Sequence, residues 1–203
     1  GDASGASSHK FSSGSFTEGR IAAKAALKYV LEHPEEPQVD MAAVKAMEEK
    51  ILAPLDRFEQ FKNASTDPDI NPNYLRPKMA MFRLQKIMDE YAGGVSTNFT
   101  CSKQSLEKAL ELLAMLKEDL ELLAAEDLHE LLRCWENVHR TWQAEVHVRT
   151  MLFRQETRWP GYYFRADCPE MNEDEWTVFV NSRWNPETGE WEMSKKPIHR
   201  IFV

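Results

Sequence analysis

The chain has 203 residues, of which 42% are hydrophobic and 29% are charged, and its formal net charge is −8. This length suffices for a domain with a substantial core, and the acidic balance argues against nucleic acid as the main partner. No apolar run approaches the about 20 residues that a membrane span requires, so the sequence predicts none.

The N-terminal part is a serine- and glycine-rich turn followed by an alanine-rich helix. The helix is predicted from about Thr17 to His33, with Thr17 or Ser15 as its N-cap and Pro34 at its end. The polar stretch from Pro34 to Asp40 is the best candidate for a domain boundary. The chain has no initiator Met, and a domain does not ordinarily begin in such a turn, so we expect a fragment of a longer protein.

Two further helices are predicted from hydrophobic residues at three- and four-residue steps. One starts near Asp40 and contains Pro54, where we expect a kink or a break. The other runs from Lys78 to Tyr91 and ends at Gly93-Gly94. The proline-containing stretch 63–77 between them is predicted to be a long loop.

The fourth and fifth helices carry the longest hydrophobic stripes. Ser102 is the predicted cap of the fourth helix, and the fifth is expected to begin near Glu126. Long amphipathic helices with a short connection pack antiparallel, which predicts a helical bundle. A dimeric coiled coil is the alternative, but the leucine stripe lasts only about three heptads, so an intramolecular core is favoured. The stripes are Leu106, Leu110, Leu113, Leu116, Leu120 and Leu123, and then Leu128, Leu131, Leu132, Trp135, Val138, Trp142, Val146 and Leu152.

The pattern changes after Trp159 to segments rich in aromatic and β-branched residues. YYFR, EWTVFVNSRWN and GEWEMSKKPIHRIFV follow one another, and residues 185–189 form a turn between the last two. This arrangement predicts a β-hairpin within about residues 160–203. Such a short appendage needs the bundle or a partner chain to pack on. The residues therefore predict a mainly α fold, a helical bundle with a short β-hairpin.

Few residues are arranged for catalysis or metal binding. The six histidines contain no pair at i,i+4 and no HExxH motif, so no metal site is predicted. The sequence also lacks a GxSxG, a P-loop and a GxGxxG motif. Cys101, Cys134 and Cys168 are widely spaced and odd in number, which predicts free thiols and a cytoplasmic protein.

Six arginines make one end of the bundle locally basic. The first four, at positions 133, 140, 149 and 154, are interpreted as solvated helix surface paired with Glu136, Glu145 and Glu156. Arg158 and Arg165 differ because they lie among Trp, Tyr and Phe in ETRWPGYYFRADCP. Aromatic neighbours restrain a guanidinium, which suits a buried ion pair or an anion contact.

The most suggestive stretch is SSHKFSSGSF, which precedes the first helix. Successive small residues there let backbone N–H groups point at a ligand, and the helix dipole favours negative charge. Without a second signal, such a turn is weak support for a cofactor site.

Several long segments resemble one enzyme family. GDASGASSHKFSSGSFTEGR, DLHELLRCWENVHRTWQAEVHVR, RWPGYYFRADCPEMNEDEW and NPETGEWEMSKKP resemble the C-terminal part of the alpha subunits of dissimilatory adenylylsulfate reductases. A looser resemblance links the chain to the succinate dehydrogenase and fumarate reductase flavoproteins. The resemblance implies that residues 1–36 are the last turn and helix of an α/β FAD-binding domain, and that residues 37–203 form a helical C-terminal domain.

The resemblance implies an FAD enzyme that reduces adenylyl sulfate to sulfite and AMP, or catalyses the reverse. In the chemistry that the resemblance implies, N5 of the reduced flavin attacks the sulfur, which releases AMP and gives a flavin–sulfite adduct. Electrons come from a beta subunit that carries 4Fe-4S clusters, and a link to a membrane electron-donor complex would be indirect. Because the alpha subunits are much longer than this chain, we expect the chain alone to be inactive.

Residue by residue, the resemblance assigns Asp2 to the flavin ribityl chain. It assigns a turn to the flavin pyrimidine edge, where backbone amides and a helix N-terminus would stabilise the negative charge of the reduced flavin. The residues of this turn are Ser13, Gly14, Ser15 and Phe16.

The preceding residues are implied to face the substrate side of the flavin. His9 and Lys10 are the candidate catalytic residues, and Phe11 is the candidate substrate-binding residue. Dicarboxylate-handling relatives have a His-Gly-x-Asn-Arg pattern where this chain has His9-Lys10-Phe11-Ser12-Ser13. The missing arginine argues against succinate or fumarate as the substrate.

Two other interpretations stay open on the sequence. One is a fragment of a fumarate reductase-type or succinate dehydrogenase-type flavoprotein. The other is a non-enzymatic helical module that binds a partner through its bundle and hairpin. Such a module does not need SSHKFSSGSF beside Gly1-Asp2, so this segment favours a flavoprotein.

Overall fold

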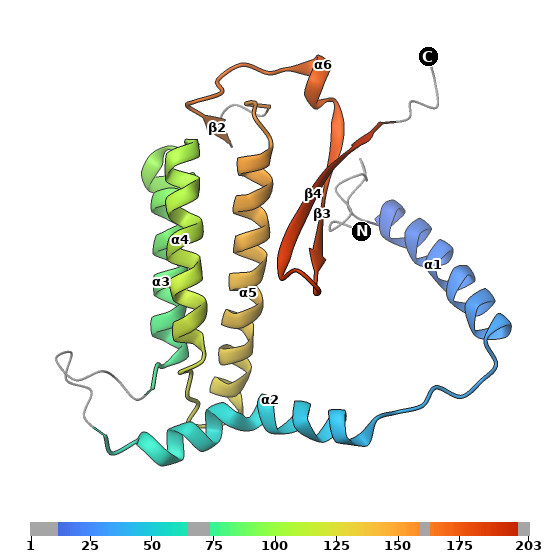
Figure 1. Cartoon of the computed structure of the whole chain (residues 1–203), viewed down its shortest axis with the longest axis vertical. Coiled ribbons are helices and arrows are strands. Elements are labelled where there is room, and N and C mark those ends of the chain that lie inside the picture. Colours follow the sequence, from blue (N-terminus) through green and yellow to red (C-terminus); the bar gives the residue numbers. More distant parts are fainter. Residues whose placement is uncertain (1–11, 65–73, 159–162, 199–203) are drawn as a thin grey trace. The chain divides into compact units, whose positions relative to one another are not determined.

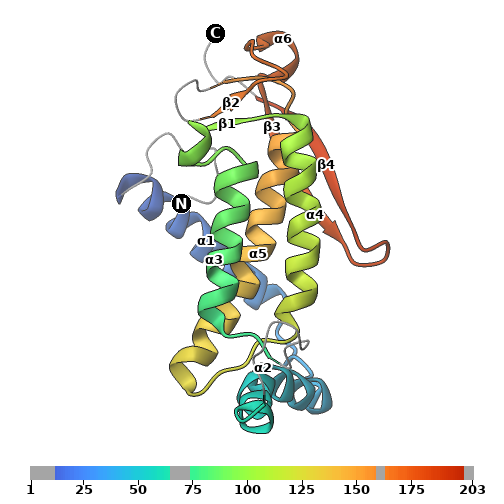
Figure 2. The ribbon, with the colours of Figure 1, turned by 90° about the vertical axis from the view of Figure 1, so that its left-hand side faces the viewer.

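The computed structural model describes residues 12–64, 74–158 and 163–198, and the chain divides into two compact units, residues 1–44 and 45–203. Within the second unit, three helices run side by side as a bundle (Figures 1 and 2). This confirms the mainly α class. No described helix is long and apolar enough to cross a membrane. The helices are α1 (Ser12–Glu32), α2 (Met41–Phe61), α3 (Pro77–Tyr91), η2 (Val95–Thr97), α4 (Lys103–Leu120), α5 (Leu128–Phe153) and α6 (Glu173–Trp176).

The two long bundle helices begin at side chains that satisfy their first backbone donors. At α4, the Ser102 hydroxyl accepts from the Ser105 N–H at 3.2 Å, and the Ser105 hydroxyl accepts from the Ser102 N–H at 2.9 Å. At α5, the Asp127 carboxylate accepts from the Glu130 N–H at 2.8 Å. A cap of this kind contributes about 1 kcal/mol. The predicted starts at Ser102 and near Glu126 are thus confirmed, to within a residue or two for α5.

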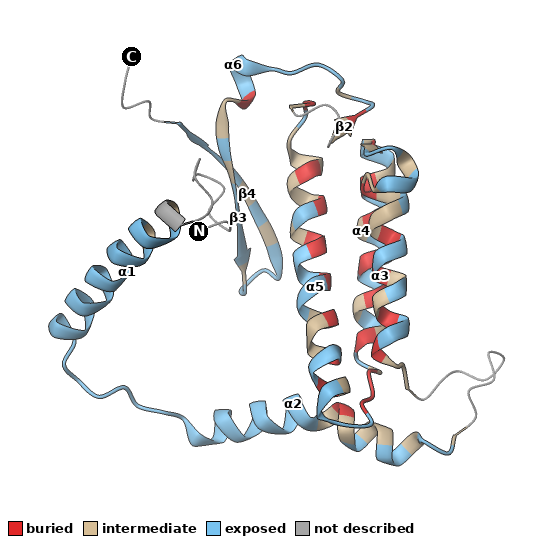
Figure 3. Cartoon of the chain, turned by 180° about the vertical axis from the view of Figure 1, so that it is seen from behind, coloured by how far each residue is buried: buried red, intermediate tan, exposed pale blue. Residues whose placement is uncertain are grey.

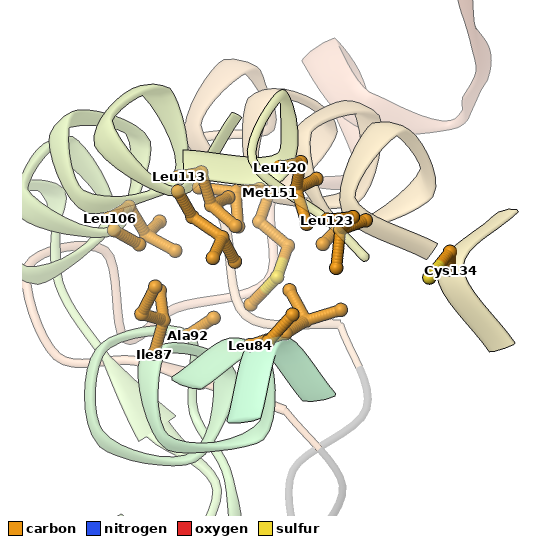
Figure 4. Packing of buried hydrophobic residues seen from close by; sticks show 14 of the residues in the cluster. Leu84, Ile87, Ala92, Leu106, Leu113, Leu120, Leu123, Cys134 and Met151 are labelled. Carbon is orange, nitrogen blue, oxygen red and sulfur yellow. The ribbon is translucent and has the colours of Figure 1, made fainter. Parts of the chain in front are cut away.

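The leucine stripe of α4 lies in an intramolecular core. Leu106, Leu113 and Leu116 are fully buried in one hydrophobic cluster. In Figure 4, Leu106 and Leu113 lie across from Leu84 of α3, with Met151 of α5 between them. Burying each leucine contributes roughly 1.5–3 kcal/mol. This packing inside one chain confirms the intramolecular core that the stripe length favoured.

The buried face of α5 differs from the predicted one. Leu128, Leu132 and Trp142 are 71%, 56% and 51% exposed, although the pattern of large apolar residues placed them inward. The buried face alternates with exposed turns along the helix (Figure 3). Several residues of the buried face, such as Thr141 and Ala144, have small side chains, which let neighbouring helices approach closely. The buried face consists of Leu131, Cys134, Asn137, Thr141, Ala144, Glu145, Val148 and Met151.

The sequence predicted a kink or a break at Pro54, and the break does not occur, because α2 continues through this residue to Phe61. Asp40 caps the helix, accepting from the N–H groups of Ala42 and Ala43 at 2.9 and 3.2 Å. Pro54 is buried, and its carbonyl accepts from the Ala125 N–H at 2.9 Å in the α4–α5 connection. The proline therefore contacts the bundle, and this tertiary contact favours a continuous helix.

Two small sheets complete the fold. β1 (Thr100–Cys101) pairs in parallel with β2 (Phe164–Arg165) and so links the start of α4 to the segment after α5. β3 (Val178–Asn185) and β4 (Glu190–Pro197) form the predicted antiparallel hairpin, with Gly189 at φ +68° in its turn. The β1–β2 pair was not predicted, because two-residue strands are too short to show alternation.

Candidate functional site

The residues assigned to the flavin fall at the first turn of α1 or before it. Asp2, His9, Lys10 and Phe11 lie outside the described residues, and these assignments stay predictions. The remaining four, residues 13–16, lie inside α1, which begins at Ser12 rather than at Thr17. The predicted turn is therefore the first turn of the helix, because serines favour helix N-termini as well as turns.

This geometry suits an anionic group. The N–H groups of residues 12–15 have no acceptor within the helix, since the first four donors of an α-helix are unsatisfied. The helix dipole adds positive potential at the same end. Phe16 is 79% exposed, and no described side chain of α1 is buried. The backbone at this helix end therefore favours an anionic group.

A second polar cluster surrounds Glu156, whose side chain is fully buried just after α5. Arg158 contacts it side-on, with Nε donating to Oε1 at 2.6 Å and Nη2 to Oε2 at 3.0 Å. Arg154 donates to the same Oε1, and the Asn172 N–H donates to Oε2 at 3.0 Å. Burial raises the pKa of Glu156, but these hydrogen bonds outweigh burial, so the pKa lies below the ordinary value.

Arg165 is buried beside this cluster. It forms two hydrogen bonds with the Asp167 carboxylate, Nε to Oδ1 at 2.9 Å and Nη2 to Oδ2 at 2.7 Å. Its Nη1 donates to the carbonyls of Met151 and Arg154 at the end of α5, where a cation also complements the helix dipole. The hydrogen bonds from Arg165 lower the pKa of Asp167 to about 2.

Of the predicted buried ion pair or anion contact, the buried ion pair is confirmed for Arg165, whereas Arg158 pairs with the buried Glu156 but is itself 25% exposed. The prediction for Arg154 is wrong as to solvation, because its side chain is only 19% exposed and also donates to the carbonyls of Trp176 and Val178 at 3.0 Å. This places Arg154 between α5, α6 and β3. The other three arginines do pair on the helix surface: Arg133 and Arg140 with Glu136, and Arg149 with Glu145.

The charged side chains of this cluster form ion pairs with one another, and these pairs indicate a structural role. The three guanidinium groups of Arg154, Arg158 and Arg165 face the carboxylates of Glu156, Glu173 and Asp167. Within the described part of the chain these charges are engaged with one another, and their ion pairs hold the segment after α5 against the bundle. Glu156 was predicted as a partner of the helix arginines, as its pairing with Arg154 bears out, whereas Asp167 and Glu173 were missed because they lie outside any helical repeat.

The family of the chain follows from comparison with known proteins. The sequence model described as "Fumarate reductase flavoprotein C-term" matches residues 81–202. The chain belongs to the fumarate reductase flavoprotein C-terminal family. The match includes the whole α4–α5 pair and the charge cluster that follows it.

Relatives within this flavoprotein family have both sequence and fold in common with the chain. It is 44% identical, over 99% of its length, to the adenylylsulfate reductase subunit alpha of Megalodesulfovibrio gigas, of which it covers 30%. The adenylylsulfate reductase structure from Archaeoglobus fulgidus is 57% identical, with a TM-score of 0.88 over 95% of this chain and 30% of that chain. The chain thus spans about a third of these relatives.

A structure with lower sequence identity shares only its fold with the chain. The Mycobacterium smegmatis Sdh1 complex is 20% identical, with a TM-score of 0.62 over 87% of this chain and 27% of that chain. Another solved structure, described as adenosine-5-phosphosulfate reductase in complex with sulfite as a covalent adduct, is 57% identical with a TM-score of 0.88 over 95% of this chain and 30% of that chain.

The cysteines of this flavoprotein C-terminal domain are free thiols, as predicted. Burial raises the pKa of Cys101 to about 11 and that of Cys134 to about 12, so neither provides a thiolate near neutral pH. Among the residues described, no group of three or more His, Cys, Asp or Glu side chains is placed to hold a metal ion.

Proposed function

We propose that this chain is the C-terminal part of the FAD-containing alpha subunit of an adenylylsulfate reductase. The whole subunit interconverts adenylyl sulfate with sulfite and AMP in a two-electron reaction. The observation that carries the proposal is 44% identity along nearly the entire chain to an alpha subunit of this enzyme. The sulfite complex of a 57% identical reductase supports sulfite as the product.

Within this function, residues 1–36 belong to the FAD-binding domain and residues 37–203 to the helical domain. When bound, FAD supplies the two-electron chemistry. Residues 13–16 direct backbone N–H groups of the α1 terminus at the pyrimidine edge, and Asp2 holds the ribityl hydroxyls. The N–H groups at this helix end have no acceptor within the helix, which supports the assignment because such groups favour a ligand that becomes anionic on reduction.

His9, Lys10 and Phe11 line the substrate side of the same site. A lysine and a histidine in this position supply positive charge and hydrogen-bond donors for a sulfate group, whereas an arginine pattern for dicarboxylates is absent. Electrons enter from a beta subunit with 4Fe-4S clusters. The protein acts in the cytoplasm, and any membrane electron-donor complex is reached indirectly.

The test uses the longer alpha subunit that contains this chain, produced together with its beta subunit. We expect reduction of an artificial electron acceptor that requires both sulfite and AMP, and no reaction with succinate. Succinate oxidation or fumarate reduction instead would support the alternative flavoprotein class. Absence of every flavin-dependent activity and of bound flavin would favour the helical interaction module.

The site assignment has a separate test in the same complex. Lys10→Met should lower kcat for sulfite oxidation by about tenfold or more, because a charge-assisted hydrogen bond contributes about 1.5–3 kcal/mol. Lys108→Met, on the exposed side of α4 and paired with Glu111, is the matched control and should leave kcat unchanged. Equal rates for Lys10→Met and the parent would remove Lys10 from the site while leaving the enzyme class intact.

A further inference from the structure

A pocket of about 290 Å³ lies where α2 meets α4 and α5, and all its lining residues belong to the second unit. On α2, Lys50, Pro54 and Arg57 contribute, and their spacing of four and then three residues places them on one helix face. The Trp135 indole Nε1 donates to the Ile51 carbonyl at 3.0 Å and holds α2 against α5. None of the lining residues belongs to the segment assigned to the flavin.

Among the described residues, the cationic side of the pocket has an Arg57 donor without an acceptor. Arg57 Nε is shut off from solvent and donates to no group in the described part of the chain. A buried donor without a partner costs about 1–3 kcal/mol and is rare in native proteins. Neither Arg57 nor Lys50 forms an ion pair with any described residue. The geometry therefore has room and positive charge for an external oxygen acceptor.

The remaining charges limit the ligand to a single negative charge. The Lys117 ammonium also lines the pocket, but it is paired with the buried carboxylate of Glu145. Glu121 is a lining carboxylate and opposes the two free cations of α2. The balance of Lys50, Arg57 and Glu121 is about one positive charge, which suits a monoanion better than a phosphate dianion.

The rest of the lining is apolar and aromatic. Leu120, Leu123 and Val138 provide aliphatic surface, and the indoles of Trp135 and Trp142 provide flat walls. Ligand sites commonly combine such a lining with a few polar groups that fix orientation. The volume corresponds to about ten water molecules, which admits a small acid and excludes a dinucleotide.

We propose that this pocket binds a small monocarboxylate with an aromatic or apolar body. The carboxylate is attracted by the positive charges of Arg57 and Lys50, while the body packs between the indoles and the leucines. The site is independent of the proposed flavin chemistry, so the two proposals can fail separately.

The test is a titration of the 203-residue chain with benzoate at constant ionic strength, followed by tryptophan fluorescence. We expect a saturable change with a Kd of about 1 mM or tighter. Benzyl alcohol, a neutral analogue of similar shape, should produce no saturable change, because it lacks the charge that Arg57 and Lys50 recognise.

Variants locate the binding. Arg57→Met and, independently, Lys50→Met should each weaken benzoate binding by about tenfold or more, while Lys45→Met on the same helix outside the pocket should bind as the parent does. Circular dichroism confirms that each variant is folded. No saturation with benzoate, an equal response to benzyl alcohol, or unchanged binding in both pocket variants would overturn the proposal.

Discussion

The fully buried carboxylate of Glu156 accepts hydrogen bonds from the guanidinium groups of Arg154 and Arg158 and from the Asn172 backbone N–H. Removing one partner of a buried ion pair leaves the others uncompensated and costs about 3–5 kcal/mol. We expect Glu156→Gln to lower the free energy of unfolding by about this amount in a urea titration. Glu136→Gln, which removes a partly exposed partner of Arg133, should cost about 0–1 kcal/mol. Similar losses for the two variants would show that the Glu156 cluster is not stabilising.

Asp167 makes stability dependent on pH. Its pKa in the folded chain is about 2, mainly because Arg165 donates to it, and an unfolded aspartate has a pKa of about 3.9. Because the folded value is the lower one, the contribution is complete above the unfolded value and is lost as pH falls toward the folded value.

The corresponding measurement compares Asp167→Asn with the parent chain by urea unfolding at several pH values. The parent should be the more stable at pH about 5, and the difference should shrink between about pH 4 and pH 2. A difference that stays constant over this range would contradict the assigned pairing.

Part of the charge cluster after α5 could be predicted from the sequence. Aromatic neighbours predicted that Arg158 and Arg165 are restrained, and Arg165 is buried whereas Arg158 is 25% exposed. The partners Glu156 and Asp167 each lie two residues from the arginine they bind. Glu156 was expected as a partner of the helix arginines, but the Arg165–Asp167 pair lies outside a helix and has no repeating spacing, so only the folded backbone reveals it.

At the scale of elements, α5 provides the sharpest test of the observed packing. Ala144 is buried and Leu132 is 56% exposed, the reverse of their hydrophobic sizes. Ala144→Leu should lower the free energy of unfolding by about 1–3 kcal/mol, because the added atoms have no space in the core. Leu132→Ala should change it by about 0.5 kcal/mol or less.

Urea titrations of the Ala144→Leu and Leu132→Ala variants measure these changes in the free energy of unfolding. A larger loss for Leu132→Ala than for Ala144→Leu would mean that α5 is rotated toward the face predicted from its large apolar residues. The parent chain, unfolded under the same conditions, is the reference for both.

Elements with local signals were predictable, and those decided by tertiary contacts were less so. The capping residues Ser102 and Asp127 and the turn at Gly189 fix their elements through neighbouring residues in sequence. The buried face of α5 and the continuity of α2 at Pro54 depend on contacts with other helices. The early start of α1 reflects serines that suit a turn and a helix terminus equally.

The charge cluster around Glu156 is complete within this chain, whereas the segment assigned to the flavin is only part of a site. In the cluster, three guanidinium groups are paired to three carboxylates. The segment assigned to the flavin contributes a helix N-terminus and a short preceding stretch. A chain that covers 30% of its relatives therefore forms its own helical core, while the proposed cofactor site requires residues from the rest of the alpha subunit.

This difference predicts that the 203-residue chain does not retain FAD. A helix N-terminus contributes about 0.3–1 kcal/mol toward an anionic group, whereas a Kd of 1 μM requires about 8.2 kcal/mol. The sequence has no GxGxxG motif to bind the pyrophosphate. We expect the purified chain, incubated with FAD and desalted, to show no visible flavin absorbance, and the longer alpha subunit treated in parallel to retain it. Flavin held stoichiometrically by the chain would mean that residues 1–36 bind the cofactor without the rest of the subunit.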